Sequence, residues 1–547
     1  MKVYQAIAQA IEEEGIDTLF AVMGDANQDL IVELCENHGV KLIHAKHEQS
    51  AVAMADGYTR FSGKIGLASV TQGPGLTNAT TSLVGARDHK SPVLILAGAT
   101  SLSDPHNPQG LVNQQNLSIL TTQASINLVH PKNTDYALSQ IFGYLRGKKG
   151  PIVLNLPQDI QKAEMIEKNW KYKKNYLPLQ RQIPTEENLN EAQMLIQKAE
   201  NPAFICGVGA VYSEAESEIK QLAGYLGAPI ATSLYAKGFC KDYPLSLGVS
   251  GGLGTGLAIK ALKQCDLLIA VGASLNQWTT HFGSVIEGKK VLQIDNRQEA
   301  FGKYVPPTVG LQGDAKVTVA ALYKKIQKSI DKKEPDQEIK KLITTFKPEN
   351  ISYNDGTTID PRRAAHHIEK YLPMEERIIV TDGGHAAMVN TQIISSSDAK
   401  NWSNAVDFGA IGQGLALSLG ACFARPGKRI THLTADASFM MNVADFHTAV
   451  IHNLPLTVFI FNDNAIGQEK HDLAHKKLNT KYADVAQPDF AKLATAFGAK
   501  GFTIEHPKDL NQIQKVLEIK EGPVVVNVRI NGEIELPVSW EIAQHLS

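Results

Sequence analysis

Short apolar runs alternate with amphipathic stretches along almost the whole chain, which is the pattern of strands and helices in a parallel α/β protein. A first helix is expected near the start, where Tyr4, Ile7, Ala8 and Ile11 share one face. The apolar runs, such as 456–461, which has no charged residue, predict strands that are buried on both faces of a sheet. These expected strands cover residues 18–23, 41–45, 65–70, 92–97, 203–208, 267–271, 290–294, 377–381, 430–435 and 456–461.

Two polar stretches of weak periodicity interrupt this alternation, at residues 164–188 and at about 329–360, and both are typical of linkers. They divide the chain into three blocks, 1–165, 189–328 and 360–547. Each block has the strand and helix pattern of one parallel sheet, and 547 residues agree with domains of roughly 150 residues each. We therefore predict an α/β protein with three doubly wound parallel-sheet domains.

Composition argues against several classes of partner and of structural site. Charged residues make up 20% of the chain and the formal net charge is −2, so nothing indicates nucleic acid or an anionic membrane as a partner. The five cysteines have no paired spacing, which argues against a disulfide framework and against a zinc site. No apolar run approaches the ~20 residues of a membrane span, and the start reads as an amphipathic helix rather than a signal peptide. We therefore expect a cytoplasmic protein with no membrane partner.

The strongest chemical signal lies in residues 429–467, which read as strand, helix and strand, with the helix expected over 439–452. Asp436 and Asp463 stand near the ends of the two strands. A right-handed crossover brings both strand ends to one edge of the sheet, where open α/β sheets bind ligands. Ser438 and the N–H groups that open the helix suit a phosphate at this edge. Two carboxylates beside a phosphate then suggest an intervening Mg²⁺.

Two segments of the first block point to a known family. Residues 46–61, KHEQSAVAMADGYTRF, read as an alanine-rich helix with Glu48 in its first turn, and residues 70–78, VTQGPGLTN, as a glycine-rich turn after a strand. Together with the 429–467 unit, these segments resemble the thiamin-diphosphate-dependent family of acetolactate synthase, benzoylformate decarboxylase and pyruvate decarboxylase. The resemblance covers essentially the whole chain, in the order pyrimidine-binding domain (1–165), central domain (189–328) and diphosphate-binding domain (360–547).

The resemblance implies a site for thiamin diphosphate and Mg²⁺. Glu48 holds the position of the glutamate that hydrogen-bonds the pyrimidine ring and promotes loss of the thiazolium C2 proton. Asp436, Asp463 and the carbonyl of Ala465 hold the positions of the Mg²⁺ ligands, and Ile411 that of an apolar residue beneath the cofactor. The other cofactor-binding positions implied by the resemblance are Pro74, Asn78, Gly384, His385, Gly409, Ala437, Ser438 and Ile466.

The chain departs from the family pattern at the diphosphate motif. Where the family usually has GDG, this chain has Ala435-Asp436-Ala437, and alanine tolerates a positive φ poorly. The change would be harmless only where the local φ is negative. Asp463 stands where asparagine is commoner, and its extra negative charge should favour a divalent cation.

The residues expected to contact substrate favour ligation over simple decarboxylation. Asp25 in a GD-x-N turn and Glu469 after the metal loop match acidic residues of decarboxylases that resemble pyruvate decarboxylase. Gln114 and Gln115 stand where those enzymes carry a histidine pair, and glutamine cannot carry a proton at neutral pH. Protonation of the acyl carbanion equivalent should then be slow, so that it attacks a second carbonyl group instead.

We therefore predict a carboligase that decarboxylates pyruvate or a related 2-keto acid and transfers the acyl group. A non-ligating 2-keto acid decarboxylase and a C–C-cleaving lyase or hydrolase with the same cofactor are the alternatives. A regulatory descendant would release no CO₂ from any 2-keto acid. An NAD-dependent dehydrogenase would need a GxGxxG turn after a strand, with an acidic residue ~20 positions later, and we find no convincing copy.

The family also implies that the pyrimidine-binding domain of one subunit meets the diphosphate-binding domain of another. We therefore expect a homodimer or homotetramer with shared active sites. The sequence does not distinguish a dimer from a tetramer, and it does not identify the donor and acceptor substrates. The glycine-rich turns of the central block favour close packing, and without a clear motif we expect neither FAD nor ADP there. His471 and His475, one helical turn apart, are expected on a solvated helix face.

Overall fold

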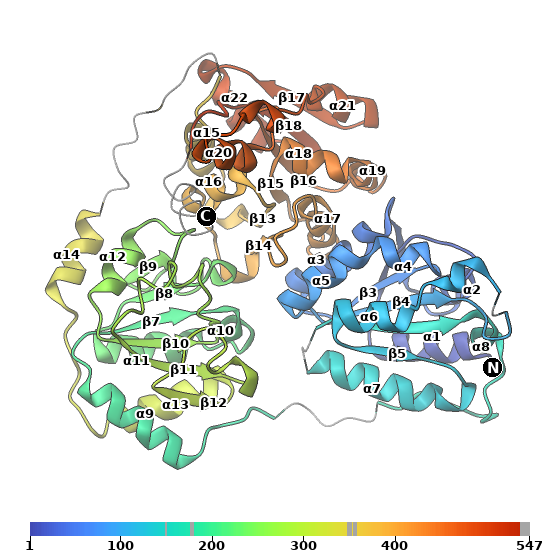
Figure 1. The fold of residues 1–547 in the computed structure, drawn as a ribbon, viewed down its shortest axis with the longest axis horizontal. Coiled ribbons are helices and arrows are strands. Elements are labelled where there is room, and N and C mark those ends of the chain that lie inside the picture. The colour runs from blue at the N-terminus through green and yellow to red at the C-terminus, as the bar shows by residue number, and fades with distance from the viewer. Residues whose placement is uncertain (105, 148–149, 175–179, 347–352, 354–357, 536–547) are drawn as a thin grey trace.

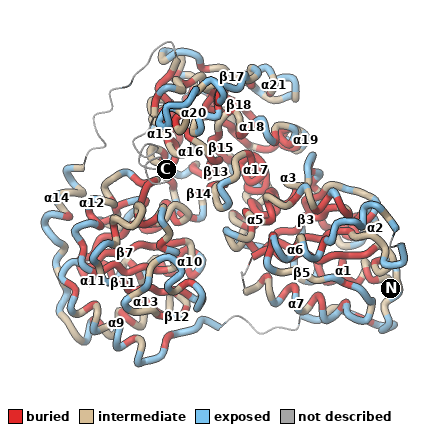
Figure 2. The backbone as a smooth tube through the Cα atoms, in the orientation of Figure 1, coloured by how far each residue is buried: buried red, intermediate tan, exposed pale blue. Residues whose placement is uncertain are grey.

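The computed structural model describes the chain except for residues 105, 148–149, 175–179, 347–352, 354–357 and 536–547. Three six-stranded sheets follow one another along the chain, and every strand pairing recorded in them is parallel (Figure 1). Helices flank the sheets, whose inner strands are almost entirely buried, whereas most strands at the sheet edges are partly exposed (Figure 2). The prediction of an α/β protein with three doubly wound parallel sheets is confirmed.

The N-terminal sheet has the strand order β2-β1-β3-β4-β6-β5. Its strands are β1 (Thr18–Ala21), β2 (Lys41–His44), β3 (Gly66–Val70), β4 (Val93–Ala99), β5 (Ser125–Asn127) and β6 (Ile152–Pro157). Its helices are α1 (Val3–Glu13), α2 (Gln28–Asn37), α3 (Glu48–Ser62), α4 (Pro74–Asn78), α5 (Thr80–His89), α6 (Gln114–Thr122), α7 (Thr134–Arg146) and α8 (Gln158–Lys162). The predicted apolar face of α1 is buried at Ile7, Ala8 and Ile11.

The central sheet has the order β12-β11-β10-β7-β8-β9. Its strands are β7 (Pro202–Cys206), β8 (Ile230–Thr232), β9 (Ser246–Val249), β10 (Leu267–Val271), β11 (Lys290–Asp295) and β12 (Val309–Gln312). Its helices are α9 (Glu186–Lys198), α10 (Val208–Tyr212), α11 (Glu216–Leu226), α12 (Leu257–Lys263) and α13 (Ala315–Ile326). Gly207, after β7, packs directly on the turn after β10, because a Cβ at Gly207 would lie 2.1 Å from the carbonyl oxygen of Gly272. This glycine therefore serves close backbone packing.

The C-terminal sheet has the order β14-β13-β15-β16-β18-β17. Its strands are β13 (Ile379–Thr381), β14 (Trp402–Asn404), β15 (Ile430–Ala435), β16 (Leu456–Asn462), β17 (Lys500–Ile504) and β18 (Val524–Arg529). Its helices are α15 (Pro361–Tyr371), α16 (His385–Ile393), α17 (Gly414–Ala424), α18 (Asp436–Met441), α19 (Phe446–Ile451), α20 (Gly467–His475), α21 (Phe490–Phe497) and α22 (Gln512–Leu517).

The 429–467 unit folds as predicted in its strands but not in its helix. β15 and β16 are adjacent and parallel, with Ala435 opposite Phe461. The prediction of one helix over 439–452 is wrong, because the chain leaves the helical conformation at Asn442 (φ −130°) and resumes in α19 after a short 3-10 turn. The apolar spacing continues across the break, since the rings of Phe439 and Phe446 pack together with centroids 6.0 Å apart.

The two predicted linkers contain ordered elements. Trp170 is only 5% exposed, and the ring of Tyr172 packs against Phe142 of α7, so the first linker folds back onto the N-terminal domain. The second linker contains helix α14 (Gln337–Thr345), which begins after Asp336, whose carboxylate caps the first turn. Residues 175–179 and most of 347–357 in these linkers lie outside the described part of the chain.

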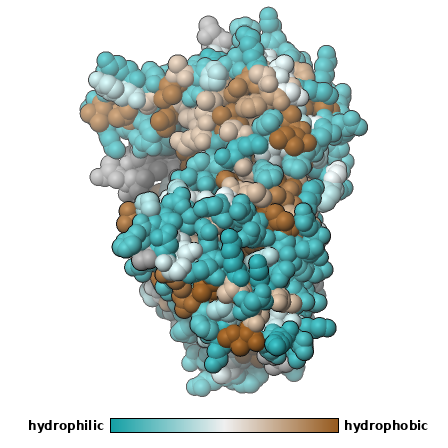
Figure 3. All heavy atoms as spheres, turned by 90° about the vertical axis from the view of Figure 1, so that its right-hand side faces the viewer, coloured by the Kyte–Doolittle hydropathy of each residue, from teal (hydrophilic) through white to brown (hydrophobic). Residues whose placement is uncertain are grey.

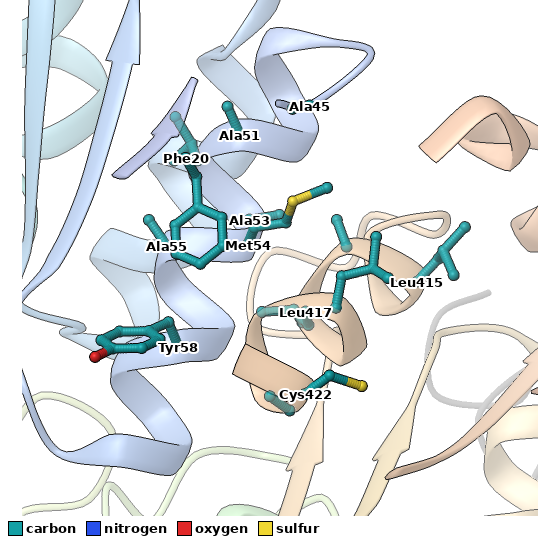
Figure 4. Packing of buried hydrophobic residues seen from close by; sticks show 14 of the residues in the cluster. Phe20, Ala45, Ala51, Ala53, Met54, Ala55, Tyr58, Leu415, Leu417 and Cys422 are labelled. Carbon is teal, nitrogen blue, oxygen red and sulfur yellow. The ribbon is translucent and has the colours of Figure 1, made fainter. Parts of the chain in front are cut away.

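Helices α3 and α17 join the N-terminal and C-terminal domains in one shared core (Figure 4). Their backbones approach so closely that a Cβ at Gly57 would lie 2.2 Å from the carbonyl oxygen of Leu417. A Cβ at Gly420 would likewise lie 2.1 Å from the carbonyl oxygen of Met54. Helix α3 carries Glu48, and α17 follows the loop that carries Ile411, so this contact holds two predicted site elements of one chain at a fixed distance.

The surface is mainly hydrophilic on the face shown in Figure 3, with separate apolar patches between the polar residues. Several large apolar side chains of the chain are well exposed, among them Leu111 (85%), Leu120 (75%), Met441 (58%) and Ile451 (58%). Within the described residues, no helix combines the length and the apolar character that crossing a bilayer requires.

Candidate active site

The two predicted metal ligands lie at the carboxyl ends of neighbouring strands. Asp436 begins α18 directly after β15 and is fully buried, and Asp463 follows β16. The Asp436 carboxylate accepts a hydrogen bond from the Asn464 N–H at 2.9 Å, and the Asp463 carboxylate accepts one from the Ala465 N–H at 3.1 Å. The strand adjacency predicted from the sequence therefore brings these two loops into contact.

The environment of both carboxylates favours a cation. Burial, together with the charge of Asp463, raises the pKa of Asp436 to about 7, and burial raises the pKa of Asp463 to about 6. Among the described residues, no three His, Cys, Asp or Glu side chains form a cluster that could hold a metal ion. A cation here would therefore need further oxygen ligands, such as the Ala465 carbonyl and a diphosphate, which suits Mg²⁺.

The alanine substitutions in the diphosphate motif cause no backbone strain. Ala435 has φ −90° and ψ 162°, an ordinary extended conformation, and Ala437 lies in α18 and is not among the described residues with positive φ. Ser438 is buried in the same helix turn. The alternative in which these methyl groups impose a strained φ therefore does not apply.

His385 lies beside the metal loop, at the start of α16. Gly384 precedes it with φ +88°, and a Cβ added to Gly467 would lie 2.6 Å from Asp463 Oδ2 and 3.6 Å from the His385 Cβ. His385 is 3% exposed, and neither of its ring nitrogens has a hydrogen-bond partner among the residues that the structure describes. Burial, with a smaller effect from His471, lowers the pKa of His385 to about 3. A buried polar side chain without partners suits a ligand that supplies acceptor oxygens, such as a diphosphate.

His471 is not on a solvated helix face, so that expectation was wrong. Its side chain is only 7% exposed, and its ring stands edge-on to His385 with centroids 4.8 Å apart. His475 is more exposed and pairs with Glu535 at 2.6 Å. The helix predicted from the spacing of His471 and His475 is present as α20. The burial of His471 was not predictable from that spacing, because its partner His385 lies more than 80 positions earlier in the chain.

The loop before α17 approaches the same sheet edge. Gly409 is exposed with φ +77°, as a position close to a ligand would require. The side chain of Ile411 lies against Gly383, since a Cβ added to that glycine would be 2.9 Å from Ile411 Cγ2. Ile411 is therefore held beside the residues that begin α16. Ile466, before α20, is 36% exposed.

Glu48 is the first residue of α3 and is partly exposed. Its carboxylate accepts a hydrogen bond from Asn78 Nδ2 at 3.0 Å, which links it to the glycine-rich turn that begins α4 at Pro74. Pro74 and Asn78 are exposed on the single chain. Within the described residues, no hydrogen bond or ion pair joins Glu48 to Asp436 or Asp463, but the N–H of Lys46, two positions before Glu48, donates to Asp445 Oδ1 at 2.8 Å.

The residues expected to contact substrate occupy different environments. Asp25 is exposed and accepts hydrogen bonds from Thr71 Oγ1 at 3.2 Å and Gln72 Nε2 at 3.1 Å. Gln114 is buried, where it accepts from the Gly73 N–H at 2.9 Å and donates to the Gly98 carbonyl at 3.0 Å. The structure therefore gives Gln114 a role in holding the glycine-rich turn. Gln115 and Glu469 are exposed, and Gln115 accepts from Asn127.

Two residues of this region were missed in the sequence. Asp382, directly after β13, and Asn442, at the break between α18 and α19, both hydrogen-bond the backbone of Gly412. A carboxylate at a strand end was a visible signal for Asp382. Nothing in the apolar spacing marked Asn442.

Comparison with known proteins finds a family match in each of the three domains. Residues 1–120 match the thiamine pyrophosphate enzyme N-terminal TPP binding domain, residues 189–322 its central domain, and residues 382–528 its C-terminal TPP binding domain. Thiamine pyrophosphate is thiamin diphosphate, so the two outer matches agree with the cofactor that the sequence implied.

Several relatives align over almost the full chain. A probable acetolactate synthase large subunit of Methanocaldococcus jannaschii is 27% identical, with 98% of this chain and 93% of the relative covered. The acetolactate synthase large subunit of Haemophilus influenzae is also 27% identical, over 96% and 94%. A sulfoacetaldehyde acetyltransferase of Alcaligenes xylosoxydans is 27% identical, over 95% and 92%. The chain therefore belongs to the family of thiamine-pyrophosphate-dependent enzymes.

Proposed function

We propose that this protein is a cytoplasmic thiamin-diphosphate- and Mg²⁺-dependent carboligase that resembles acetolactate synthase. It decarboxylates pyruvate or a related 2-keto acid and transfers the acyl group to a second carbonyl compound. The observation that carries the cofactor and metal assignment is the proximity of two carboxylates with raised pKa, the buried Asp436 at the start of α18 and the half-buried Asp463 after β16, which a cation would stabilise. The relatives named acetolactate synthase support the reaction type.

In this proposal the chain's own residues have distinct roles. Asp436, Asp463 and the Ala465 carbonyl hold Mg²⁺, and the starts of α16 and α18, with Gly384, His385, Ala437 and Ser438, bind the diphosphate. Thiamin diphosphate, when bound, supplies a nucleophilic carbon and accepts the electrons released with CO₂. Glu48 moves the proton on the pyrimidine side, the Gly409 carbonyl accepts from the pyrimidine amine, and Ile411 supports the cofactor from below. Ile466, between Ala465 and α20, borders the site.

Ligation follows from the shortage of proton donors near the predicted substrate position. Gln114 has its side-chain amide engaged with backbone groups, and neither it nor Gln115 can carry a proton at neutral pH. Asp25 and Glu469 are the carboxylates that favour the second candidate, a non-ligating decarboxylase. Cleavage of a C–C bond by a lyase or hydrolase would use the same cofactor residues.

Product analysis separates these reactions. The protein is incubated with pyruvate, thiamin diphosphate and Mg²⁺, and the products are identified by mass spectrometry. We expect acetolactate or acetoin to exceed acetaldehyde. Acetaldehyde as the dominant product would support the decarboxylase, and a panel of 2-keto acids and candidate acceptors would then define the substrates. Absence of CO₂ release from every 2-keto acid in the panel would contradict both.

We further propose a homodimer, or a homotetramer built from such dimers, in which each active site combines Glu48 of one subunit with Asp436 of another. Glu48 is half-buried and Pro74 and Asn78 are exposed on the single chain, and no hydrogen bond or ion pair among the described residues connects Glu48 to Asp436 or Asp463. A second copy would complete the site and cover part of the exposed apolar surface. We propose that the central domain holds neither FAD nor ADP.

Hybrid dimers test the shared site directly. A chain with Glu48→Gln and a differently tagged chain with Asp436→Ala are co-expressed, and the heterodimer is purified through both tags. Each homodimer should be nearly inactive. The hybrid should recover about half of the wild-type activity, since one of its two sites keeps both residues. A hybrid as inactive as the two homodimers would show that both residues act within one chain.

A further inference from the structure

The loop that carries Ile411 is held by a buried carboxylate. Asp382 Oδ1 accepts hydrogen bonds from the N–H groups of Gly383 at 2.8 Å and Gly412 at 3.0 Å. Asp382 Oδ2 accepts from the N–H of Gly414 at 3.2 Å and from Thr434 Oγ1 at 3.4 Å. One side chain therefore connects the end of β13, the loop before α17 and strand β15.

The same loop is held from the opposite side by Asn442. Its Nδ2 donates to the Gly412 carbonyl at 2.7 Å, so both backbone groups of Gly412 are bound by side chains. Asn442 reaches this carbonyl from the break between α18 and α19, outside a regular helix. Its Oδ1 also lies 3.5 Å from Ser50 Oγ, two positions after Glu48 on α3. The irregularity that separates the two helices thus places an amide between helix α3 and the Gly412 loop of the same chain.

Steric constraints leave Gly412 little freedom. Its φ is +90°, and an added Cβ would lie 2.9 Å from the Met441 Cβ and 3.3 Å from the Ser438 carbonyl oxygen. The preceding residue, Ile411, is packed on Gly383, next to Asp382. A shift of Gly412 would therefore move Ile411 with it.

The chemistry of Asp382 shows why a carboxylate is needed here. The side chain is 1% exposed, and among the described residues it has no cationic partner. Burying such a group is unfavourable unless hydrogen bonds compensate for lost hydration. Four donors converge on its two oxygens, and an amide side chain offers only one acceptor oxygen. The site therefore requires an acceptor-only group, which a merely space-filling residue would not provide.

We propose that Asp382 and Asn442 are positioning residues that fix Gly412 from both sides and thereby place Ile411 and Gly409 for the cofactor. This inference rests on the proposed function. Neither residue contacts the cofactor in this scheme, because each acts through the backbone of the loop. We call the hydrogen bonds that Asp382 and Asn442 make with Gly412 the clamp. Misplacement of a supporting group by about 1 Å can reduce turnover about 100-fold, so loss of the clamp should lower kcat more than it changes KM.

The first test is independent of the cofactor. Asp382→Asn replaces one acceptor oxygen by an N–H donor, and Asn442→Ala removes the bond to the Gly412 carbonyl. Hydrogen–deuterium exchange of the cofactor-free protein, followed by mass spectrometry, should show faster exchange in peptides that contain Gly412 and Gly414. Unchanged exchange in both variants would refute the clamp, whatever reaction the enzyme catalyses.

The second test concerns positioning. At saturating cofactor, kcat should fall about 10–100-fold in each variant while KM changes less than about threefold. Ser250→Ala is the matched control, since it removes an equally buried bond, from Ser250 Oγ to the Thr279 carbonyl in the central domain, and should leave kcat unchanged. Thermal unfolding of all three variants shows how much stability each one loses, so that changes in kcat can be compared at similar losses of stability.

A double-mutant cycle identifies the route of the effect. If Asp382 acts through Ile411, Asp382→Asn should cost much less in an Ile411→Ala background than in the wild type. Additive losses in the cycle would overturn the proposal. So would a fall in kcat in Ser250→Ala equal to that in Asp382→Asn, because the effect would then reflect a general loss of stability. A wild-type protein with no thiamin-diphosphate-dependent reaction would instead refute the proposed function, and the exchange experiment would still decide on the clamp.

Discussion

Glu48→Gln is expected to reduce the rate at which the C2 proton of bound thiamin diphosphate exchanges with deuterium by about 10²–10⁴-fold, the range of a general acid–base contribution. Glutamine keeps the length of the side chain and an acceptor for Asn78 Nδ2, but it cannot bind and release a proton near neutral pH. Cofactor affinity should change little, because the metal and diphosphate contacts belong to the C-terminal domain. The exchange is measured by quenching samples in acid and recording the proton NMR spectrum of the cofactor.

The control applies the same change at Glu36, an exposed residue of α2 in the same domain. Glu36→Gln should exchange at the wild-type rate. An unchanged exchange rate in Glu48→Gln at saturating cofactor would remove Glu48 from its assigned role. A reduced rate that recovers at higher cofactor concentration would make Glu48 a binding residue instead.

The elements that could be predicted are those whose pattern of apolar residues lies within one short segment of the chain. Apolar runs such as 430–435 and 456–461 became β15 and β16, because a strand covered on both faces must be apolar throughout. The right-handed crossover then placed their ends side by side, which correctly predicted the proximity of the Asp436 and Asp463 loops. Eight strands were not predicted: β5, β6, β8, β9, β12, β14, β17 and β18. β5, β8 and β14 have three residues each, too few to show a pattern that distinguishes them from loops. β6 and β18 are buried six-residue runs whose apolar signal was present in the sequence and was overlooked.

The parts of the site that could not be predicted depend on contacts between distant segments. Asn442 interrupts a helix whose apolar spacing continues through the break, so periodicity alone predicted one helix over 439–452. His471 lies on the predicted helix, but its burial depends on His385. Asp382 accepts from Gly412 and Gly414, which are 30 and 32 positions away. Hydrogen bonds of this kind leave no periodic trace in a sequence.

Asp436→Ala is expected to weaken Mg²⁺-dependent binding of thiamin diphosphate by more than the 10–100-fold that the loss of an outer-sphere partner typically causes. The variant removes one of the two carboxylates that we assign to the metal. Its affinity for the cofactor should become nearly the same with Mg²⁺ as with EDTA. Isothermal titration calorimetry under both conditions measures the difference directly. Asp463→Asn should retain most of the Mg²⁺ effect, because an amide oxygen can still ligate the cation.

We do not expect loss of the fold to explain this result, because burial of the ionised Asp436 carboxylate is unfavourable in the cofactor-free protein. Its pKa is raised from 3.8 to about 7, so the stability it contributes when protonated is lost as the pH rises through about 7. Cofactor-free Asp436→Ala should therefore unfold at pH 8 at a temperature no lower than the wild type. Asp436→Asn, which keeps an acceptor for the Asn464 N–H, separates the metal role from the role in linking the two loops. Saturation of Asp436→Ala at the wild-type cofactor concentration would contradict the metal assignment, because cofactor binding would then not depend on the Asp436 carboxylate.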